Sequence, residues 1–184
     1  MSGIIAGLRS NNGLVCEELI VSFPLPPDIR RATTDDVSAI RRLVNDAYRE
    51  LEDLGLNFTG TYQDEQTTFE RMQGAEVYLL YRQNELVASI NISLKELESD
   101  ASRCIYIHQL AVRPDQKRKG IGTYLLDLAE SRAVHEGISY LQLDTAIPAT
   151  HLVKLYKRQG FKPIAEVQWE GKTYKSYIME KRLG

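Results

Sequence analysis

The sequence contains little cysteine, and the two that it has show no pattern of a metal site or of a disulfide framework. Cys16 and Cys104 lie far apart and lack the close spacing of zinc ligands. A chain of 184 residues can bury a sizeable core, so it does not depend on disulfides for stability. We therefore expect a reduced protein without a bound metal.

Long apolar runs and a strong net charge are also missing. No apolar stretch approaches the roughly 20 residues that span a bilayer. The apolar patch from Gly3 to Leu8 lacks the basic segment that opens a signal peptide. The net charge of -2 gives no general attraction to nucleic acid. These absences predict a soluble, cytoplasmic protein with no membrane or nucleic-acid partner.

The remaining composition is that of one globular domain. Hydrophobic residues make up 43% of the chain and charged residues 26%, which is ordinary for a soluble domain. Residues 1–27 end in Phe23-Pro24-Leu25-Pro26-Pro27, and these prolines favour an extended backbone. We expect residues 1–27 to form an N-terminal extension and residues 28–184 to form the domain.

Hydrophobic periodicity in residues 28–184 predicts a mixed α/β fold. Strands are expected at 29–33, 77–81, 86–94, 104–112, 138–145, 161–169 and 174–181, and helices at 34–53, within 57–73, at 121–136 and at 148–158. The strand–helix–strand unit over 104–145 requires a right-handed crossover and parallel strands, whereas the last two strands form an antiparallel hairpin. In the helix over 121–136, Leu125, Leu128 and Val134 are expected to face the core. The fold class is a single-domain mixed sheet of six to seven strands flanked by about four helices.

The segment between the strand over 104–112 and the following helix is typical of a phosphate-binding loop. It reads Val112-Arg113-Pro114-Asp115-Gln116-Lys117-Arg118-Lys119-Gly120-Ile121-Gly122-Thr123. Gly120 and Gly122 permit a tight backbone and leave room for a ligand. Free N–H groups at the start of the helix attract an anion, and Lys117, Arg118 and Lys119 add positive charge. The loop suits a pyrophosphate, and a solvated basic turn without a ligand is the alternative.

Two other phosphate-binding motifs do not match this segment. The Walker loop needs Gly-x-x-x-x-Gly-Lys-Ser/Thr, and the third glycine of the dinucleotide fingerprint is absent. The segment instead resembles the acetyl-CoA loop of the GNAT acetyltransferase superfamily, Gln/Arg-x-x-Gly-x-Gly/Ala, with Lys117 at the first position and Arg118 where glycine is common. Leu155-Tyr156-Lys157-Arg158-Gln159-Gly160-Phe161 resembles the family's Leu-Tyr-x-x-x-Gly-Phe. The resemblance covers about residues 29 to 183.

This resemblance implies an N-acetyltransferase that transfers an acetyl group from its cosubstrate acetyl-CoA to a primary amine. The reaction would be direct attack through a tetrahedral intermediate, without a metal. In the family the fourth strand carries a bulge and pairs its free edge with pantetheine. The implied cofactor-binding residues are Leu110, Ala111, Val112, Lys117, Arg118, Lys119, Gly120, Ile121, Gly122 and Thr123. The acceptor would be a small-molecule amine or a peptide amine, and a homodimer is one assembly that the family uses.

Two side chains are candidates for proton transfer. By resemblance, Tyr156 would act as a general acid that protonates or holds the CoA thiolate, while a packed core tyrosine is the alternative. His108 precedes Val112 by four residues, and a histidine pKa of roughly 6.5 suits a general base near neutrality. A core histidine is the alternative for His108. A water ordered by Gln109 could replace it as base, and Tyr106 on the same face could extend a proton path.

Other readings of the same residues stay open. Phe58, Tyr62, Asp64 and Glu65 lie where family members often line the acceptor site, and an acidic pair would suit a cationic amine. A solvated loop is the alternative for this segment. A catalytically silent CoA-binding or regulatory module could use the same fold, although the presence of Tyr156 and His108 favours catalysis. A nucleic-acid binder using residues 116–119 is disfavoured by the net charge and by the lack of a second basic patch.

Overall fold

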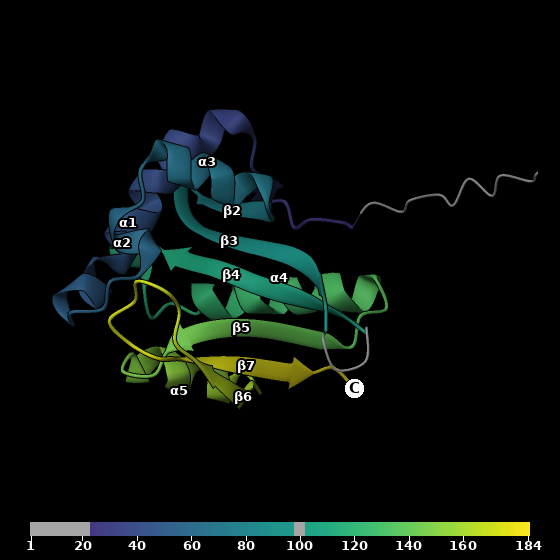
Figure 1. The fold of residues 1–184 in the computed structure, drawn as a ribbon. Helices are drawn as coiled ribbons and strands as arrows, with labels where there is room; N and C mark the ends of the chain where they lie inside the picture. Colours follow the sequence, from purple (N-terminus) through teal and green to yellow (C-terminus); the bar gives the residue numbers. More distant parts are fainter. Residues whose placement is uncertain (1–22, 98–101) are drawn as a thin grey trace, which may run out of the picture.

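The structure, a computed structural model, describes residues 23–97 and 102–184 and confirms the predicted mixed α/β fold (Figure 1). Its seven-stranded sheet has the order β1-β2-β3-β4-β5-β7-β6. The strands are β1 (Ile29–Arg31), β2 (Glu76–Arg82), β3 (Glu85–Glu96), β4 (Arg103–Val112), β5 (Tyr140–Ala146), β6 (Lys162–Val167) and β7 (Ser176–Arg182). The helices are α1 (Val37–Asp53), α2 (Thr59–Tyr62), α3 (Glu65–Gln73), α4 (Ile121–His135) and α5 (Thr150–Arg158), with short 3-10 helices η1 (Thr34–Asp36) and η2 (Pro114–Gln116). Of the expected N-terminal extension, residues 1–22, including Cys16, lie outside the described residues.

The direction of the sheet changes between β4 and β5. Residues Cys104 to Ile107 pair in parallel with Tyr140 to Leu143, and α4 provides the crossover, as predicted. The neighbouring pairs β3–β4 and β5–β7 are antiparallel. The predicted terminal hairpin is present, but β7 rather than β6 continues the sheet from β5.

A bulge in β4 separates this strand from β5. Opposite β4, Asn91 pairs with Gln109 and Ile92 pairs with Ile107, so His108 is the extra residue. A bulge bends the strand that carries it and leaves backbone groups unpaired. The parallel register with β5 stops at Ile107, although β4 continues to Val112. The bulge that the family resemblance implied is therefore present and is centred on His108.

Helices cover both faces of the sheet, as the alternation of side chains along β2 shows. Tyr78 and Leu80 belong to the hydrophobic cluster that contains α4, whereas Val77 and Leu79 belong to the cluster that contains α1. This alternation follows from the two-residue period of a strand, which sends successive side chains to opposite faces. The functional residues on β4 are thus held from both sides.

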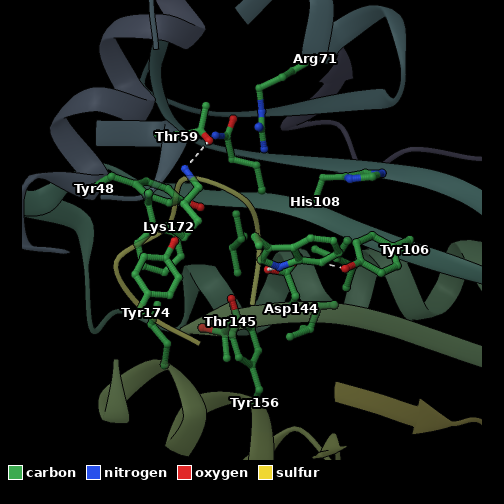
Figure 2. A pocket seen from close by; sticks show the side chains of 18 of the residues that line it. Tyr48, Thr59, Arg71, Tyr106, His108, Asp144, Thr145, Tyr156, Lys172 and Tyr174 are labelled. Carbon is green, nitrogen blue, oxygen red and sulfur yellow. Dashed lines mark hydrogen bonds between the residues drawn. The ribbon is translucent and has the colours of Figure 1, made fainter. Parts of the chain in front are cut away.

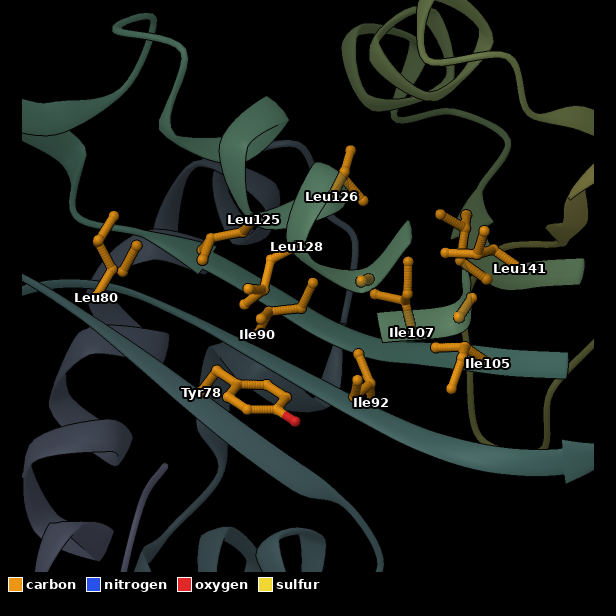
Figure 3. Packing of buried hydrophobic residues seen from close by; sticks show 14 of the residues in the cluster. Tyr78, Leu80, Ile90, Ile92, Ile105, Ile107, Leu125, Leu126, Leu128 and Leu141 are labelled. Carbon is orange, nitrogen blue, oxygen red and sulfur yellow. The ribbon is translucent and has the colours of Figure 1, made fainter. Parts of the chain in front are cut away.

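The larger cluster fixes α4 on the centre of the sheet (Figure 3). Figure 3 shows Leu125 and Leu128 of α4 above Ile90 of β3, and Leu125 is fully buried. Each such leucine contributes about 1.5–3 kcal/mol by burial. Val134 was expected to join them, but it is 63% exposed because it lies on the outer side of α4. Since this core sets the position of α4 against β4, it also sets the loop that joins them.

Gly60 allows α2 to approach α1 closely. A Cβ atom at this position would lie 2.8 Å from Cδ1 of Tyr48, a distance that real Cβ atoms essentially never show. Gly60 is buried, and the ring that it faces is held in place by this contact. The glycine therefore positions a tyrosine that lines the cavity described below.

We expect Gly60→Ala to lower the free energy of unfolding by about 1–3 kcal/mol, because the added methyl group must displace the Tyr48 ring. Gly74→Ala is the matched control, since the nearest atom to its added Cβ lies 4.0 Å away and its φ is -90°. Urea denaturation of both variants measures the difference. A Gly60→Ala protein as stable as the parent chain would contradict the close approach of α2 to α1.

Candidate active site

The diverging ends of β4 and β5 line a cavity of about 350 Å³ (Figure 2). Helices α1, α2, α3 and α5 contribute to its wall, together with the loop between β6 and β7. The cavity brings together His108 of β4, Asp144 of β5 and Tyr156 of α5, which lie far apart in the sequence. Both residues predicted for proton transfer thus face one cavity.

His108, the bulge residue, has its imidazole at the edge of this cavity. Its Nε2 lies 2.7 Å from Oγ of Ser93, and its ring centroid lies 4.9 Å from that of Tyr106. In the tautomer in which Nε2 donates its hydrogen to Ser93, Nδ1 is left free to accept a proton. The side chain keeps access to solvent, so it is not the packed core histidine that was the alternative.

The surroundings of His108 lower its pKa. Partial removal of the ring from water at the cavity edge is the largest cause, and the positive charge of Arg71 lowers the pKa further, followed by that of Lys95. Asp144 opposes them by stabilising the protonated ring. An imidazole with a pKa below its usual value is neutral at pH 7 and therefore ready to accept a proton.

Asp144 joins three parts of the cavity wall. Its Oδ1 accepts a hydrogen bond from the Tyr106 hydroxyl at 2.9 Å, and its Oδ2 accepts one from Nε1 of Trp169 at 3.2 Å. Burial, together with the nearby Asp144, raises the pKa of Tyr106, so its hydroxyl stays protonated and acts as a donor. Tyr106 therefore contacts His108 through its ring and Asp144 through its hydroxyl, while a proton path through Tyr106 stays a prediction.

Tyr156 reaches the cavity from α5, close to Thr145 in Figure 2. Its side chain is 8% exposed, and its ring packs edge-on against Phe161 with a centroid distance of 6.1 Å. Burial raises the pKa of Tyr156, and the nearby Tyr48 and Asp144 raise it further. Its hydroxyl is consequently protonated at every physiological pH, which suits a hydrogen-bond donor.

Gln109, the residue considered for ordering a water, is part of a buried amide network. Its Nε2 donates to Oε1 of Gln63 at 3.0 Å, and Nε2 of Gln63 donates to Oγ1 of Thr68 at 2.9 Å. Gln109 and Gln63 are only 3% and 2% exposed. This network fastens α3 and the segment before it to β4, so its first task is structural.

The acidic residues considered for the acceptor site lie elsewhere. Asp64 caps α3 by accepting a hydrogen bond from the backbone N–H of Thr67 at 2.8 Å, and Glu65 faces Arg41 at 3.7 Å. The acidic lining is therefore wrong, because these carboxylates serve the start of a helix. Phe58 does line the cavity, where it stacks on Tyr174 with a centroid distance of 4.9 Å.

The loop ahead of α4 has a backbone suited to an anion. Arg118 and Gly120 have left-handed φ values of 62° and 80°, and Gly120 is the N-cap of α4. Within the described ranges, no acceptor is recorded for the backbone N–H groups of residues 118–123, whereas Tyr124 N–H donates to the Gly120 carbonyl at 2.9 Å. A Cβ at Gly120 would meet nothing within 4 Å, so the nest is open to a ligand.

The three basic side chains of this loop lie differently. Nζ of Lys117 donates to the Ala47 carbonyl at 2.8 Å and lies 2.9 Å from Oε1 of Glu50, so Lys117 ties the loop to α1. Nζ of Lys119 donates to Gln116 at 3.2 Å, and Arg118 is exposed. Positive charge therefore remains beside the nest although Lys117 is already paired.

The predicted pantetheine edge, Leu110 to Val112, lies between this nest and the cavity. It keeps its pairing with β3, up to Ala88 opposite Val112, but has no register with β5 in the described sheet. A Cβ at Gly122 would lie 4.0 Å from Cδ2 of Leu110, so the loop and the strand edge are neighbours. Ile121 is buried below, and Oγ1 of Thr123 accepts a hydrogen bond from Gln159 at 3.3 Å.

Residues 23–97 and 102–184 bring together no group of three or more His, Cys, Asp or Glu side chains that could hold a metal ion. None of the helices in these ranges has the length and hydrophobicity of a membrane span. Cys104 is buried with a free thiol, and burial raises its pKa. A protonated, enclosed thiol is a poor nucleophile.

A family model described as the Acetyltransferase (GNAT) family matches residues 38–161. The chain therefore belongs to the GNAT acetyltransferase family, and the class predicted from the loop and the Leu-Tyr segment is confirmed.

Two curated relatives from Bacillus subtilis (strain 168) agree with this class. S-alkylcysteine N-acetyltransferase is 26% identical over 146 residues, which cover 77% of this chain and 82% of the relative. S-(2-succino)cysteine N-acetyltransferase is 25% identical over 162 residues, covering 86% and 98%. The crystal structure of ribosomal-protein-S18-alanine N-acetyltransferase from Escherichia coli has the same fold, with a TM-score of 0.66 at 18% identity over 85% of this chain and 93% of that one. The protein is thus an acetyl-CoA-dependent N-acetyltransferase.

Sequence reasoning missed the part of the cavity wall that lies outside the family motifs. Its polar and aromatic members are Tyr48, Thr59, Arg71, Lys95, Asp144, Thr145, Trp169, Lys172 and Tyr174. They come from six separate elements or loops, and no local spacing joins them. The aromatic and basic turn from Trp169 to Lys172 was a visible signal, but its contact with Asn57 at 2.9 Å is set by the tertiary fold.

We expect His108 to titrate with a pKa below the usual value of about 6.5. Arg71→Gln should raise this pKa, because removal of a nearby positive charge makes protonation easier. Arg42→Gln, which removes an exposed arginine that contacts Ser38, should leave it unchanged. NMR titration of the histidine ring protons measures all three proteins. A pKa of His108 at or above the usual value would contradict the described surroundings.

Proposed function

We propose that this protein acetylates a small-molecule primary amine by direct attack of the amine on acetyl-CoA, with the β4–β5 cavity as the transfer site. The observation that carries the proposal is the bulge at His108. It separates β4 from β5 at the point where a free strand edge, a histidine of lowered pKa and a buried tyrosine surround one cavity.

The open nest and the strand edge next to it fit acetyl-CoA in two parts. The N–H groups of residues 118–123 and the helix dipole of α4 suit the diphosphate, with Arg118 and Lys119 beside them. The edge from Leu110 to Val112 suits pantetheine, which would add to β4 like a strand. Four residues of strand span about 13 Å, so this edge leads from the nest to His108.

The amine must lose a proton to become a nucleophile. An alkyl amine has a pKa of roughly 10 and is mostly protonated at pH 7. In this proposal His108, directly or through one water, takes that proton at the imidazole nitrogen that Ser93 leaves free. Tyr106 and Asp144 stabilise the imidazolium that results, since Asp144 favours the protonated ring.

Backbone donors and Tyr156 would then manage the negative charge. Burial raises the pKa of Tyr48 to about 12, so its hydroxyl also stays protonated at the wall of the cavity. Backbone N–H groups of β4 that the bulge leaves unpaired are suited to donate to the oxyanion of the tetrahedral intermediate. Because the pKa of Tyr156 lies above its ordinary value, its hydroxyl is better suited to hold the departing thiolate by a hydrogen bond than to give its proton up completely.

The size and enclosure of the cavity support a small acceptor. Its volume of about 350 Å³ is at the lower end of small-molecule sites. The β6–β7 loop closes one side, where Nδ2 of Asn57 donates to the Gly171 carbonyl at 2.8 Å and Thr173 N–H donates back to Asn57 at 2.9 Å. The two relatives named for cysteine derivatives support the same choice over a peptide amine.

Acetyl-CoA is expected to raise the melting temperature of the protein, and Gly120→Glu should abolish this rise because a carboxylate would fill and repel the nest. Gly137→Glu is the matched control. It lies at the other end of α4, has a φ of 66° and has nothing within 4 Å of an added Cβ, so it carries the same backbone strain. Thermal unfolding with and without saturating acetyl-CoA measures the effect. Equal shifts in both variants would exclude the nest as the diphosphate site.

His108→Gln should lower kcat/KM by roughly a hundredfold or more, and Tyr156→Phe should lower kcat by about ten- to a hundredfold. In the parent enzyme, a plot of log(kcat/KM) against pH should be steeper by one unit below the pKa of His108 than above it, because the protonated ring cannot act as base. His108→Gln should lose that step, whereas His135→Gln, at the exposed end of α4, should keep it. Thiol release from acetyl-CoA across an amine panel provides the assay. No release with any amine would favour the catalytically silent module.

A further inference from the structure

We propose that Arg71 of α3 binds a carboxylate of the acceptor, so that the acceptor is an amine that also carries a carboxylate, as an α-amino acid does. The inference rests on the proposed function, because it assigns a ligand group to the acceptor side of the same cavity. It concerns a residue that belongs to neither family motif.

Arg71 is a cation in the cavity wall that has no counterion among the residues that the structure describes. Figure 2 shows its side chain reaching from α3 toward the cavity, on the side of Thr59 and His108. Its Nε is buried without a hydrogen-bond partner, and within the described chain no carboxylate lies within ion-pair distance of Arg71. Arg132, also largely buried, contrasts with it because it pairs with Glu76 at 3.0 Å.

The other charges of the cavity leave this deficit in place. Lys172 donates to neutral oxygens only, at 2.9 Å to the Asn57 carbonyl and 3.0 Å to Oγ1 of Thr59. Lys95 lies over the Tyr106 ring at 4.7 Å. Among the residues of 23–97 and 102–184, Asp144 is the single carboxylate on the wall, and both of its oxygens already accept hydrogen bonds. Three cations therefore face one occupied anion, and an incoming carboxylate is favoured.

The chemistry of arginine narrows the missing group to a planar anion. A guanidinium offers parallel N–H donors that match both oxygens of a carboxylate. Arg71 is close enough to His108 to lower its pKa, so a carboxylate on Arg71 would lie near the amine that His108 deprotonates. An α-amino acid places these two groups on one carbon. The nest at the start of α4 is a separate anion site, so Arg71 is not needed for the diphosphate.

Matched acceptors separate recognition of the carboxylate from transfer to the amine. S-benzyl-L-cysteine, its carboxamide and S-benzylcysteamine share the thioether and the primary amine, but only the first carries a carboxylate. We would measure kcat/KM for each by thiol release at about pH 8.5, where His108 is neutral with or without the charge of Arg71. The proteins are the parent enzyme, Arg71→Gln, Arg71→Lys and the surface control Arg42→Gln.

The parent enzyme and Arg42→Gln should prefer the amino acid to both analogues that lack a carboxylate. Arg71→Gln should lose roughly ten- to a hundredfold in kcat/KM for the amino acid and less than about threefold for the analogues, mostly through KM. Arg71→Lys should lie between the two, because it keeps the charge and loses the paired donors. An unchanged thermal shift with acetyl-CoA shows that the variants are folded.

Different results would contradict carboxylate binding by Arg71 and the proposed acetyl transfer. If the parent enzyme has the same kcat/KM for the two analogues without a carboxylate as for the amino acid, or if Arg71→Gln lowers kcat/KM equally for all three, carboxylate binding by Arg71 is wrong while the transfer reaction stands. If no acceptor is acetylated by the parent enzyme, the proposed function is wrong and the inference falls with it.

Discussion

One extra residue in β4 determines how this domain can work. Because His108 is a bulge, β4 bends away from β5 and the parallel ladder stops at Ile107. Backbone groups that would otherwise form hydrogen bonds between β4 and β5 are left facing a cavity. The same bend brings the His108 ring to that cavity. Interrupted pairing in the middle of a sheet is costly, and the dense core between α4 and the neighbouring strands holds it open.

Around this opening, positive charge is arranged in two separate places. The start of α4 offers backbone amides with Arg118 and Lys119 at the surface, while the cavity wall offers Arg71 and Lys172. Asp144 of β5 accepts hydrogen bonds from both Tyr106 and Trp169. The loop before α4 and the cavity wall thus both carry positive charge, and the pKa of His108 is lowered because partial burial and the charges of Arg71 and Lys95 disfavour its protonated ring.

The fold and the left-handed backbone of the loop before α4 could be predicted from the sequence because their signals are local, while coenzyme binding by this loop stays a prediction. Apolar periodicity gave the order of strands and helices, and the glycines and basic residues of 117–122 marked the nest. The acceptor side could not be predicted in this way. Asp64 and Glu65 have the right composition, but Asp64 caps α3 and Glu65 is its first residue. Arg71 and Lys172 line one cavity because α3 and the β6–β7 loop, which are far apart in the sequence, both border it. The prediction that Val134 faces the core was wrong by one position, because the neighbouring Ala133 lies on the inner face of α4 and Val134 on the outer face.

The side chain of Lys117 links the two halves of the site. It extends from the loop before α4 and donates a hydrogen bond to the Ala47 carbonyl on α1. Ala47 directly precedes Tyr48, which lines the cavity. Any displacement of the loop must therefore pull on that wall or break the contact. The loop before α4 and the wall of the cavity are thus mechanically joined through one lysine side chain.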